Sequence, residues 1–254
     1  MLWLFLCLAF APFAPRSSAQ PQASTRERFV LFHAAKDEAG CEKLWRENPG
    51  EVLYAIDEDL EGSLATWEKS PEKPDASAIA AQQERAIWGA RLATRASGHP
   101  IFFDYASSFA GLTEPGKRDF RAGQRAHGAS RGALKAKDFA TAEAEARKCI
   151  ALAAPLGDWW GHAMGLAALG DALAAAGKHA DAVAPLGEAA LIYRDLQLAG
   201  AELAALRTLA KSLTALDAKL RAKAVLERAI AIAKAAGEAK LEAELSAELA
   251  ALAK

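Results

Sequence analysis

A pattern of small and large apolar residues that returns every ~40 residues dominates the second half of the chain. When the segment Leu166–Ile192 is shifted by one such period in either direction, Ala182 falls on Ala142 and on Ala222. The leucines of the preceding segment superimpose in the same way, with Leu166, Leu169 and Leu173 falling on Leu206, Leu209 and Leu213. A fixed period of this length is typical of a solenoid, in which each helical hairpin buries its apolar face only by stacking on its neighbours.

The composition of this half favours helices. About a third of the residues from Arg121 onward are alanine, the strongest helix former. Apart from the short segment Arg28–Phe32, no stretch alternates apolar and polar residues as a half-buried strand would. We therefore predict an all-α protein.

The best-defined repeat combines close-packing residues with leucines. A Leu169-Gly170 pair stands in its first helix and Gly177 in its turn, and its second helix has the small-large-small row Ala182, Leu186 and Ala189. These features resemble the tetratricopeptide repeat (TPR) family, in a variant of about 40 residues instead of the usual ~34. The resemblance covers about half of the chain. It implies a right-handed superhelical stack of antiparallel helical hairpins, a TPR-like α-solenoid.

Breaks in the pattern divide the chain into five segments. Ser70–Asp75, which contains two prolines, is the best boundary. We predict a signal peptide at 1–19, an N-terminal helical region at 20–70, a linker at 71–75, a helical pair at 76–116 that is a candidate degenerate repeat, and three TPR-like repeats with a C-terminal capping helix at 117–254.

The N-terminus carries a short apolar run. Residues 2–13 read LWLFLCLAFAPF and precede Arg16 and the small-residue site Ser17-Ser18-Ala19. The run is too short for a membrane crossing of ~20 residues but suits the core of a signal peptide. We therefore expect export to the periplasm or the medium. No basic residue precedes the run, so an upstream start or a retained N-terminus is the alternative.

The charge balance argues against nucleic-acid binding. Removal of residues 1–19 takes away Arg16, one of 31 basic residues, and none of the 32 acidic ones, which leaves a formal charge of −2. Nonspecific binding to nucleic acid needs a basic face. Cleavage also removes Cys7, and the remaining Cys41 and Cys149 either pair or stay as buried thiols.

An acidic segment has the spacing of a calcium loop. Asp57-Glu58-Asp59-Leu60-Glu61-Gly62 is followed by Glu68 at the twelfth position, as in an EF-hand. A helical apolar stripe from Leu53 to Trp67 runs through the same residues, and one segment cannot be both a continuous helix and a loop. A solvated acidic helix face is the favoured interpretation, and a calcium-binding module at Asp57–Glu68 is an alternative.

A second alternative is a serine hydrolase. Gly128-Ala129-Ser130-Arg131-Gly132 fits the nucleophile-elbow pattern, and Asp158 or Asp171 and then His162 or His179 follow in hydrolase order. The elbow requires a strand that enters a sharp turn, and no strand is predicted before it. Ser130 also takes the repeat position of Gly170, where a small residue is needed for packing. We therefore predict that the chain is not an enzyme, with no catalytic residue.

No cofactor or metal site is predicted. The histidines His33, His99, His127, His162 and His179 share no helical step of three or four residues, and the sequence has no phosphate loop or dinucleotide fingerprint.

The TPR resemblance implies that the first helices of successive hairpins line a concave groove for a partner segment. The charged and polar residues that we place on this groove are His127, Arg131, Lys135, Asp171, Arg207 and Lys211, with Met164, Ala168 and Thr208 beside them. Their balance is basic, so the expected partner is a protein or peptide with acidic groups. The alternative is that these charges only keep an alanine-rich helix soluble.

Overall fold

The computed structural model describes residues 23–252, so the predicted signal peptide lies outside the described residues. Within this range the chain forms α-helices and two short 3-10 helices and contains no strand, which confirms the all-α prediction. The described residues include no helix that is both long and apolar enough to cross a membrane.

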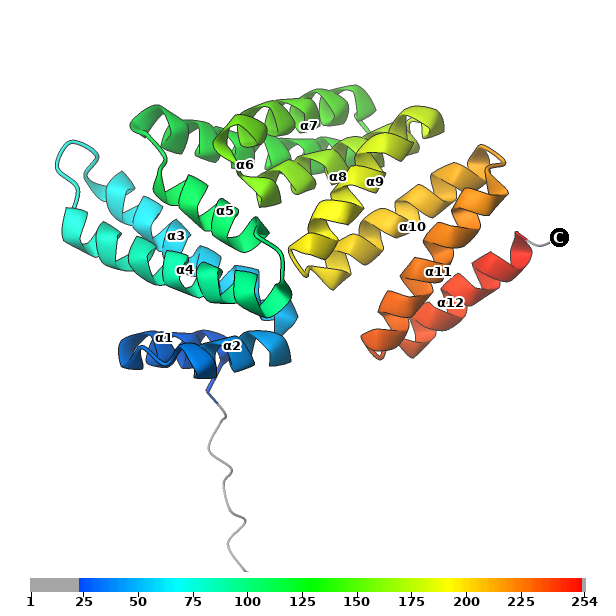
Figure 1. Cartoon of the computed structure of the whole chain (residues 1–254). Coiled ribbons are helices and arrows are strands. Elements are labelled where there is room, and N and C mark those ends of the chain that lie inside the picture. Colours follow the sequence, from blue (N-terminus) through cyan, green and yellow to red (C-terminus); the bar gives the residue numbers. More distant parts are fainter. Residues whose placement is uncertain (1–22, 253–254) are drawn as a thin grey trace, which may run out of the picture.

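The helices follow one another with short turns (Figure 1). The first five and their 3-10 turn are α1 (Thr25–Ala35), α2 (Glu38–Glu47), η1 (Pro49–Glu51), α3 (Val52–Lys69), α4 (Ala76–Ser97) and α5 (Ile101–Ala110). The remaining elements are α6 (Glu114–Lys135), α7 (Phe139–Ala153), η2 (Ala154–Leu156), α8 (Trp159–Ala175), α9 (His179–Asp195), α10 (Ala199–Ala215), α11 (Lys219–Ala235) and α12 (Ala239–Ala251).

Helices α6 to α12 pack consecutively as a stack of antiparallel hairpins. Helices α8, α10 and α12 begin one repeat period apart, and so do α7, α9 and α11. The small residues Ala142, Ala182 and Ala222 occupy the same place in α7, α9 and α11, and each is 0% exposed. The hairpin stack predicted from the repeat is therefore confirmed.

Close helix packing explains the glycine of the best-defined repeat. A Cβ atom added at Gly170 would lie 2.3 Å from Cγ of Leu186 on the facing helix α9. A larger side chain at this position would therefore displace Leu186 or push the two helices of the hairpin apart.

The turns of the stack share one backbone conformation. A residue with positive φ recurs at even spacing along the stack, at Lys137, Gly157, Gly177, Gln197, Asp217 and Gly237. This left-handed conformation ends each helix, and glycine adopts it without the steric cost of a Cβ atom. Each helix and its turn thus occupy half of a repeat period.

The N-terminal helices form their own arrangement beside the stack. Helix α1 begins with a capping box, in which Ser24 and Glu27 exchange reciprocal hydrogen bonds. The chain breaks between α1 and α2, where Lys36 has positive φ and the Asp37 side chain caps α2. Helices α3 and α4 pack against each other across the Ser70–Asp75 turn.

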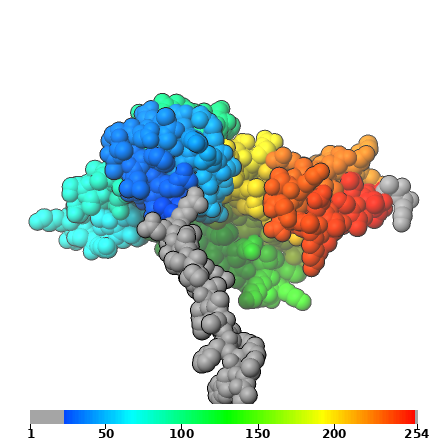
Figure 2. Space-filling model, turned by 90° about the horizontal axis from the view of Figure 1, so that it is seen from below, coloured from blue at the N-terminus to red at the C-terminus, as the bar shows by residue number. Residues whose placement is uncertain are grey.

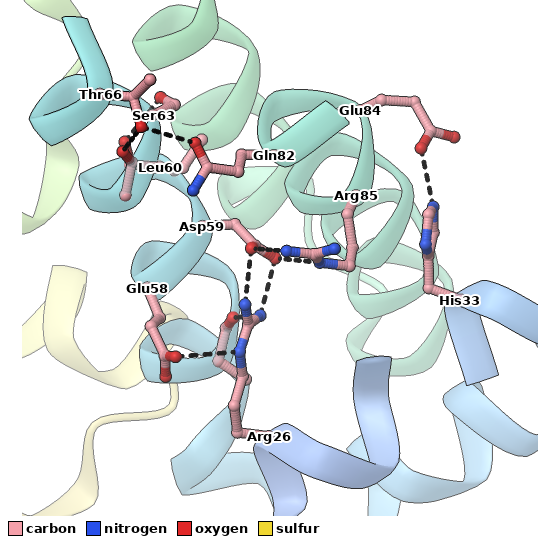
Figure 3. A network of polar contacts seen from close by, with 12 residues as sticks. Arg26, His33, Glu58, Asp59, Leu60, Ser63, Thr66, Gln82, Glu84 and Arg85 are labelled. Carbon is pink, nitrogen blue, oxygen red and sulfur yellow. Dashed lines mark hydrogen bonds and ion pairs between the residues drawn. The ribbon is translucent and has the colours of Figure 1, made fainter. Parts of the chain in front are cut away.

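A buried carboxylate ties α1, α3 and α4 together (Figure 3). The Asp59 side chain is 1% exposed and accepts two hydrogen bonds from Arg26, at 2.7 and 2.6 Å. Arg85 donates two more, one of them at 2.8 Å from its Nε. Burial raises the pKa of Asp59, but the two guanidinium groups outweigh burial and hold it below its usual value.

The chain follows a curved path from α1 to α12. In Figure 1 it rises from α1 and α2 through α3–α5, crosses the top along α6–α9 and descends along α10–α12. Figure 2, which looks from below, shows α1 and α2 (blue) and the C-terminal helices (orange to red) with part of the stack (yellow) between them.

Candidate partner-binding groove

Three of the predicted groove residues occupy one repeat register. Arg131 on α6, Asp171 on α8 and Lys211 on α10 follow one another at intervals of one repeat period. Arg131 approaches Asp171, with 3.5 Å between Nη1 and Oδ2, and Thr208 on α10 donates a hydrogen bond of 2.9 Å to Oδ1 of Asp171. The structure thus brings together residues from three successive first helices, and we call their shared surface the groove face.

Asp171 is committed to contacts inside the protein. Burial raises the pKa of its carboxyl above the ordinary value, and the Thr208 hydrogen bond and the Arg131 charge act in the opposite direction. The two carboxylate oxygens of Asp171 already contact Thr208 and Arg131. Asp171 therefore links α8 to α10 and α6 and presents little charge to a partner.

Three of the predicted groove cations, Lys135, Arg207 and Lys211, make no ion pair within the described residues. The Nε atom of Arg207 is buried and lacks a hydrogen-bond partner in this part of the chain. By contrast, Arg228 on the neighbouring α11 donates two hydrogen bonds to the carboxylate of Glu202 and forms a bidentate ion pair with it. The groove face therefore carries positive charge that the described chain does not neutralise.

His127 adds a neutral group to this surface. Burial, and then the positive charge of Arg131, lower the pKa of its imidazole below the usual value. At pH 7 the ring is uncharged and can both donate and accept a hydrogen bond.

The groove face continues into a hollow that the sequence analysis missed. A cavity of about 480 Å³ lies between α10 and α12, with α11 behind it. Its lining residues are Lys211, Thr214, Ala215, Leu226, Glu248, Ala251 and Leu252. The signal was available in the repeat register, because Ala251 stands one repeat period after Lys211.

The other end of the groove face is aromatic. The ring of Tyr54 on α3 meets that of Trp160 on α8 edge to face, with 5.4 Å between centroids, and Tyr54 stays 52% exposed. Met164 lies one turn after Trp160 and is half-buried. Sequence reasoning could not place Tyr54 here, because α3 lies outside the periodic part of the chain.

The structure contradicts the calcium alternative. Residues 57–68 lie inside the continuous helix α3 and form no loop. Arg121 on α6 pairs with Glu61 at 2.6 Å and with Glu68 at 2.8 Å. The described residues contain no group of three or more His, Cys, Asp or Glu side chains suited to a metal. The favoured interpretation was also wrong in part, because Asp59 is buried and not part of a solvated face.

The elbow geometry of a serine hydrolase is absent at Ser130. The residue lies within helix α6, not on a strand-to-helix turn. Its side chain is buried, and its hydroxyl donates a hydrogen bond of 2.8 Å to the carbonyl oxygen of Ala142. Ser130 therefore joins the two helices of its hairpin.

The two cysteines of the described chain are free thiols. Burial raises the pKa of Cys41 to about 12 and that of Cys149 to about 11. Both are therefore protonated at neutral pH, as expected for small core residues.

The comparisons with known proteins give a distant structural likeness. No family model matches the sequence, and no curated protein matches it. Among solved structures, the chain is similar to one of nearly identical TPR-like repeats assigned to a kinesin light chain of Podosopora anserina. The identity is 16%, the match covers 84% of this chain and 99% of that chain, and the TM-score is 0.39.

Proposed function

We propose that this protein is an interaction scaffold that holds an extended or helical segment of a partner protein in a concave groove along α6, α8 and α10. The observation that carries the proposal is the pair of cations Arg207 and Lys211, which have no acidic partner within residues 23–252. A partner segment with carboxylates supplies the missing charges.

The chemistry of the two cations suits such a partner. Arginine binds a carboxylate through two parallel hydrogen bonds, and lysine adds a mobile point charge one helical turn away. Charge complementarity of this kind speeds association and discriminates against basic partners. The aromatic end at Tyr54 and Trp160 offers apolar contact area to the same segment.

Charge reversal of the groove face tests the proposal. The double variant Arg207→Glu and Lys211→Glu is compared with Arg118→Glu and Arg147→Glu, whose side chains are exposed and pair only within their own helices. A photo-crosslinking residue at position 214, applied in the source cell, identifies the bound segment by mass spectrometry. The groove double variant loses that crosslink and the control double variant keeps it.

Two results would count against the groove. One is an unchanged crosslink in the Arg207→Glu and Lys211→Glu variant, with helicity intact by circular dichroism. The other is a crosslinked segment without acidic residues.

We further propose that the scaffold works outside the cytoplasm, in the cell envelope or beyond. The support is the sequence of residues 1–19, with its apolar run and its small-residue site. Mass determination of the protein purified from its source tests this, because cleavage after Ala19 leaves Gln20 as the first residue. A mature protein that retains residues 1–19 would contradict export by this route.

A further inference from the structure

The last two helices, α11 and α12, present an exposed leucine side chain next to a second hollow. Leu220 near the start of α11 is 86% exposed. Beside it lies a cavity of about 440 Å³ that is lined by Lys219, Leu220, Lys223, Glu227, Leu249, Ala250 and Leu252. Only Leu252 also borders the hollow at Lys211, so this cavity is separate from the groove face.

The rim of this cavity carries both signs of charge. Lys219 and Lys223 lie beside Leu220, and Glu227 lies one turn further along α11. Within the described residues, Lys219 makes no ion pair, and Lys223 reaches Glu227 only at 3.8 Å. An exposed pair of this kind contributes little by itself and is free to exchange partners.

A protruding leucine, an apolar hollow and opposite charges on one surface are the components of a self-complementary patch. A two-fold axis brings the same patch of two molecules face to face, so that each feature meets its counterpart. We propose that two copies of this chain associate through α11 and α12, with Leu220 of each copy in the hollow of the other. The lysines of one copy then face Glu227 of the other.

The size of the patch predicts a weak dimer. A helix of 17 residues is about 25 Å long, so the exposed side of α11 and α12 covers a few hundred Å². Two such surfaces bury about 1,000 Å² in total, near the lower end of specific interfaces. We therefore expect a dissociation constant in roughly the micromolar range.

Sedimentation of the whole mature chain, at concentrations from about 1 to 200 μM, tests the proposal. We expect a reversible monomer–dimer equilibrium in the unmodified protein. Leu220→Glu weakens the dimer by at least about 30-fold, because a carboxylate would have to enter the apolar hollow of the other copy. The matched control is Leu191→Glu on α9, which replaces another exposed leucine at 51% exposure and leaves the equilibrium unchanged.

Charge exchange provides a second, independent readout. Lys219→Glu with Lys223→Glu, and separately Glu227→Lys, each weaken the dimer of the altered chain. Mixing the two altered chains restores association, because opposite charges again face each other. A monomer at every concentration, or a dimer that is insensitive to Leu220→Glu, would overturn the proposal. Failure of the mixture to associate would overturn the two-fold arrangement.

Discussion

The hydroxyl of Tyr105 donates a hydrogen bond of 2.5 Å to Oδ1 of Asp57, and this bond joins α5 to α3 at the boundary with the hairpin stack. Burial, together with the nearby charges of Glu61 and Asp158, raises the pKa of Asp57 to about 7. The Tyr105 hydrogen bond and the positive charge of Arg121 act in the opposite direction. Burial likewise raises the pKa of Asp158, which caps α8, to about 6.

The raised pKa values of Asp57 and Asp158 make the free energy of unfolding depend on pH. Because the folded-state pKa values lie above the ordinary value, ionisation of these carboxyls costs stability as the pH rises through 6 and 7. We expect the free energy of unfolding in urea to fall by about 2–4 kcal/mol between pH 5 and pH 8. Asp57→Asn removes most of this slope, and an equal slope in that variant would contradict the assignment.

The charged centre of the N-terminal helices provides a second prediction. Asp59→Asn leaves Arg26 and Arg85 partly buried without their shared carboxylate. Breaking a buried ion pair in this way costs about 3–5 kcal/mol. Chemical denaturation measures the loss, and Glu58→Gln, which alters an exposed neighbour of Arg26, is the matched control with a cost below about 1 kcal/mol.

Close packing in the second hairpin provides a third prediction. Gly170→Ala places a methyl group against Leu186, and we expect a destabilisation of about 1–3 kcal/mol. Gly187→Ala on the facing helix meets no atom within 4 Å and gains helix propensity, so it stabilises by up to about 1 kcal/mol. Thermal unfolding distinguishes the two, and equal effects would show that the helices do not approach as described.

The turn conformation provides a fourth prediction. Gly177→Ala forces a side chain into positive φ and costs about 1 kcal/mol. Lys137→Gly at the equivalent turn relieves the same strain and stabilises by up to about 1 kcal/mol. Opposite shifts in the midpoint of denaturation are the expected result.

The periodic half of the fold could be predicted because packing and sequence share one period. Ala142, Ala182 and Ala222 must each be small for the same reason, so they appear in the sequence at the spacing of the hairpins. Ser130 followed from this register as a packing residue, and its burial agrees. The shared repeat register of Arg131, Asp171 and Lys211 could be anticipated on the same basis.

The packing of the helices in the non-periodic half could not be predicted, because the residues that contact one another there are distant in sequence. Asp59 looked like part of a solvated acidic face, and nothing local indicates that Arg26 and Arg85 converge on it from two other helices. The pairing of Tyr54 with Trp160 likewise depends on how α3 docks against α8. Helical periodicity shows which side of α3 is apolar but not which helix covers it.

The even spacing of the left-handed turn residues restricts how the gene can change in length. Duplication of one complete two-helix unit between positions 139 and 219 would keep the apolar contacts between neighbouring helices, and the stack would lengthen by one repeat. An insertion of one or two residues inside a helix would rotate everything after it by about 100° per residue and expose the apolar side to water. Whole-hairpin duplication is thus the length change that this architecture accommodates most readily.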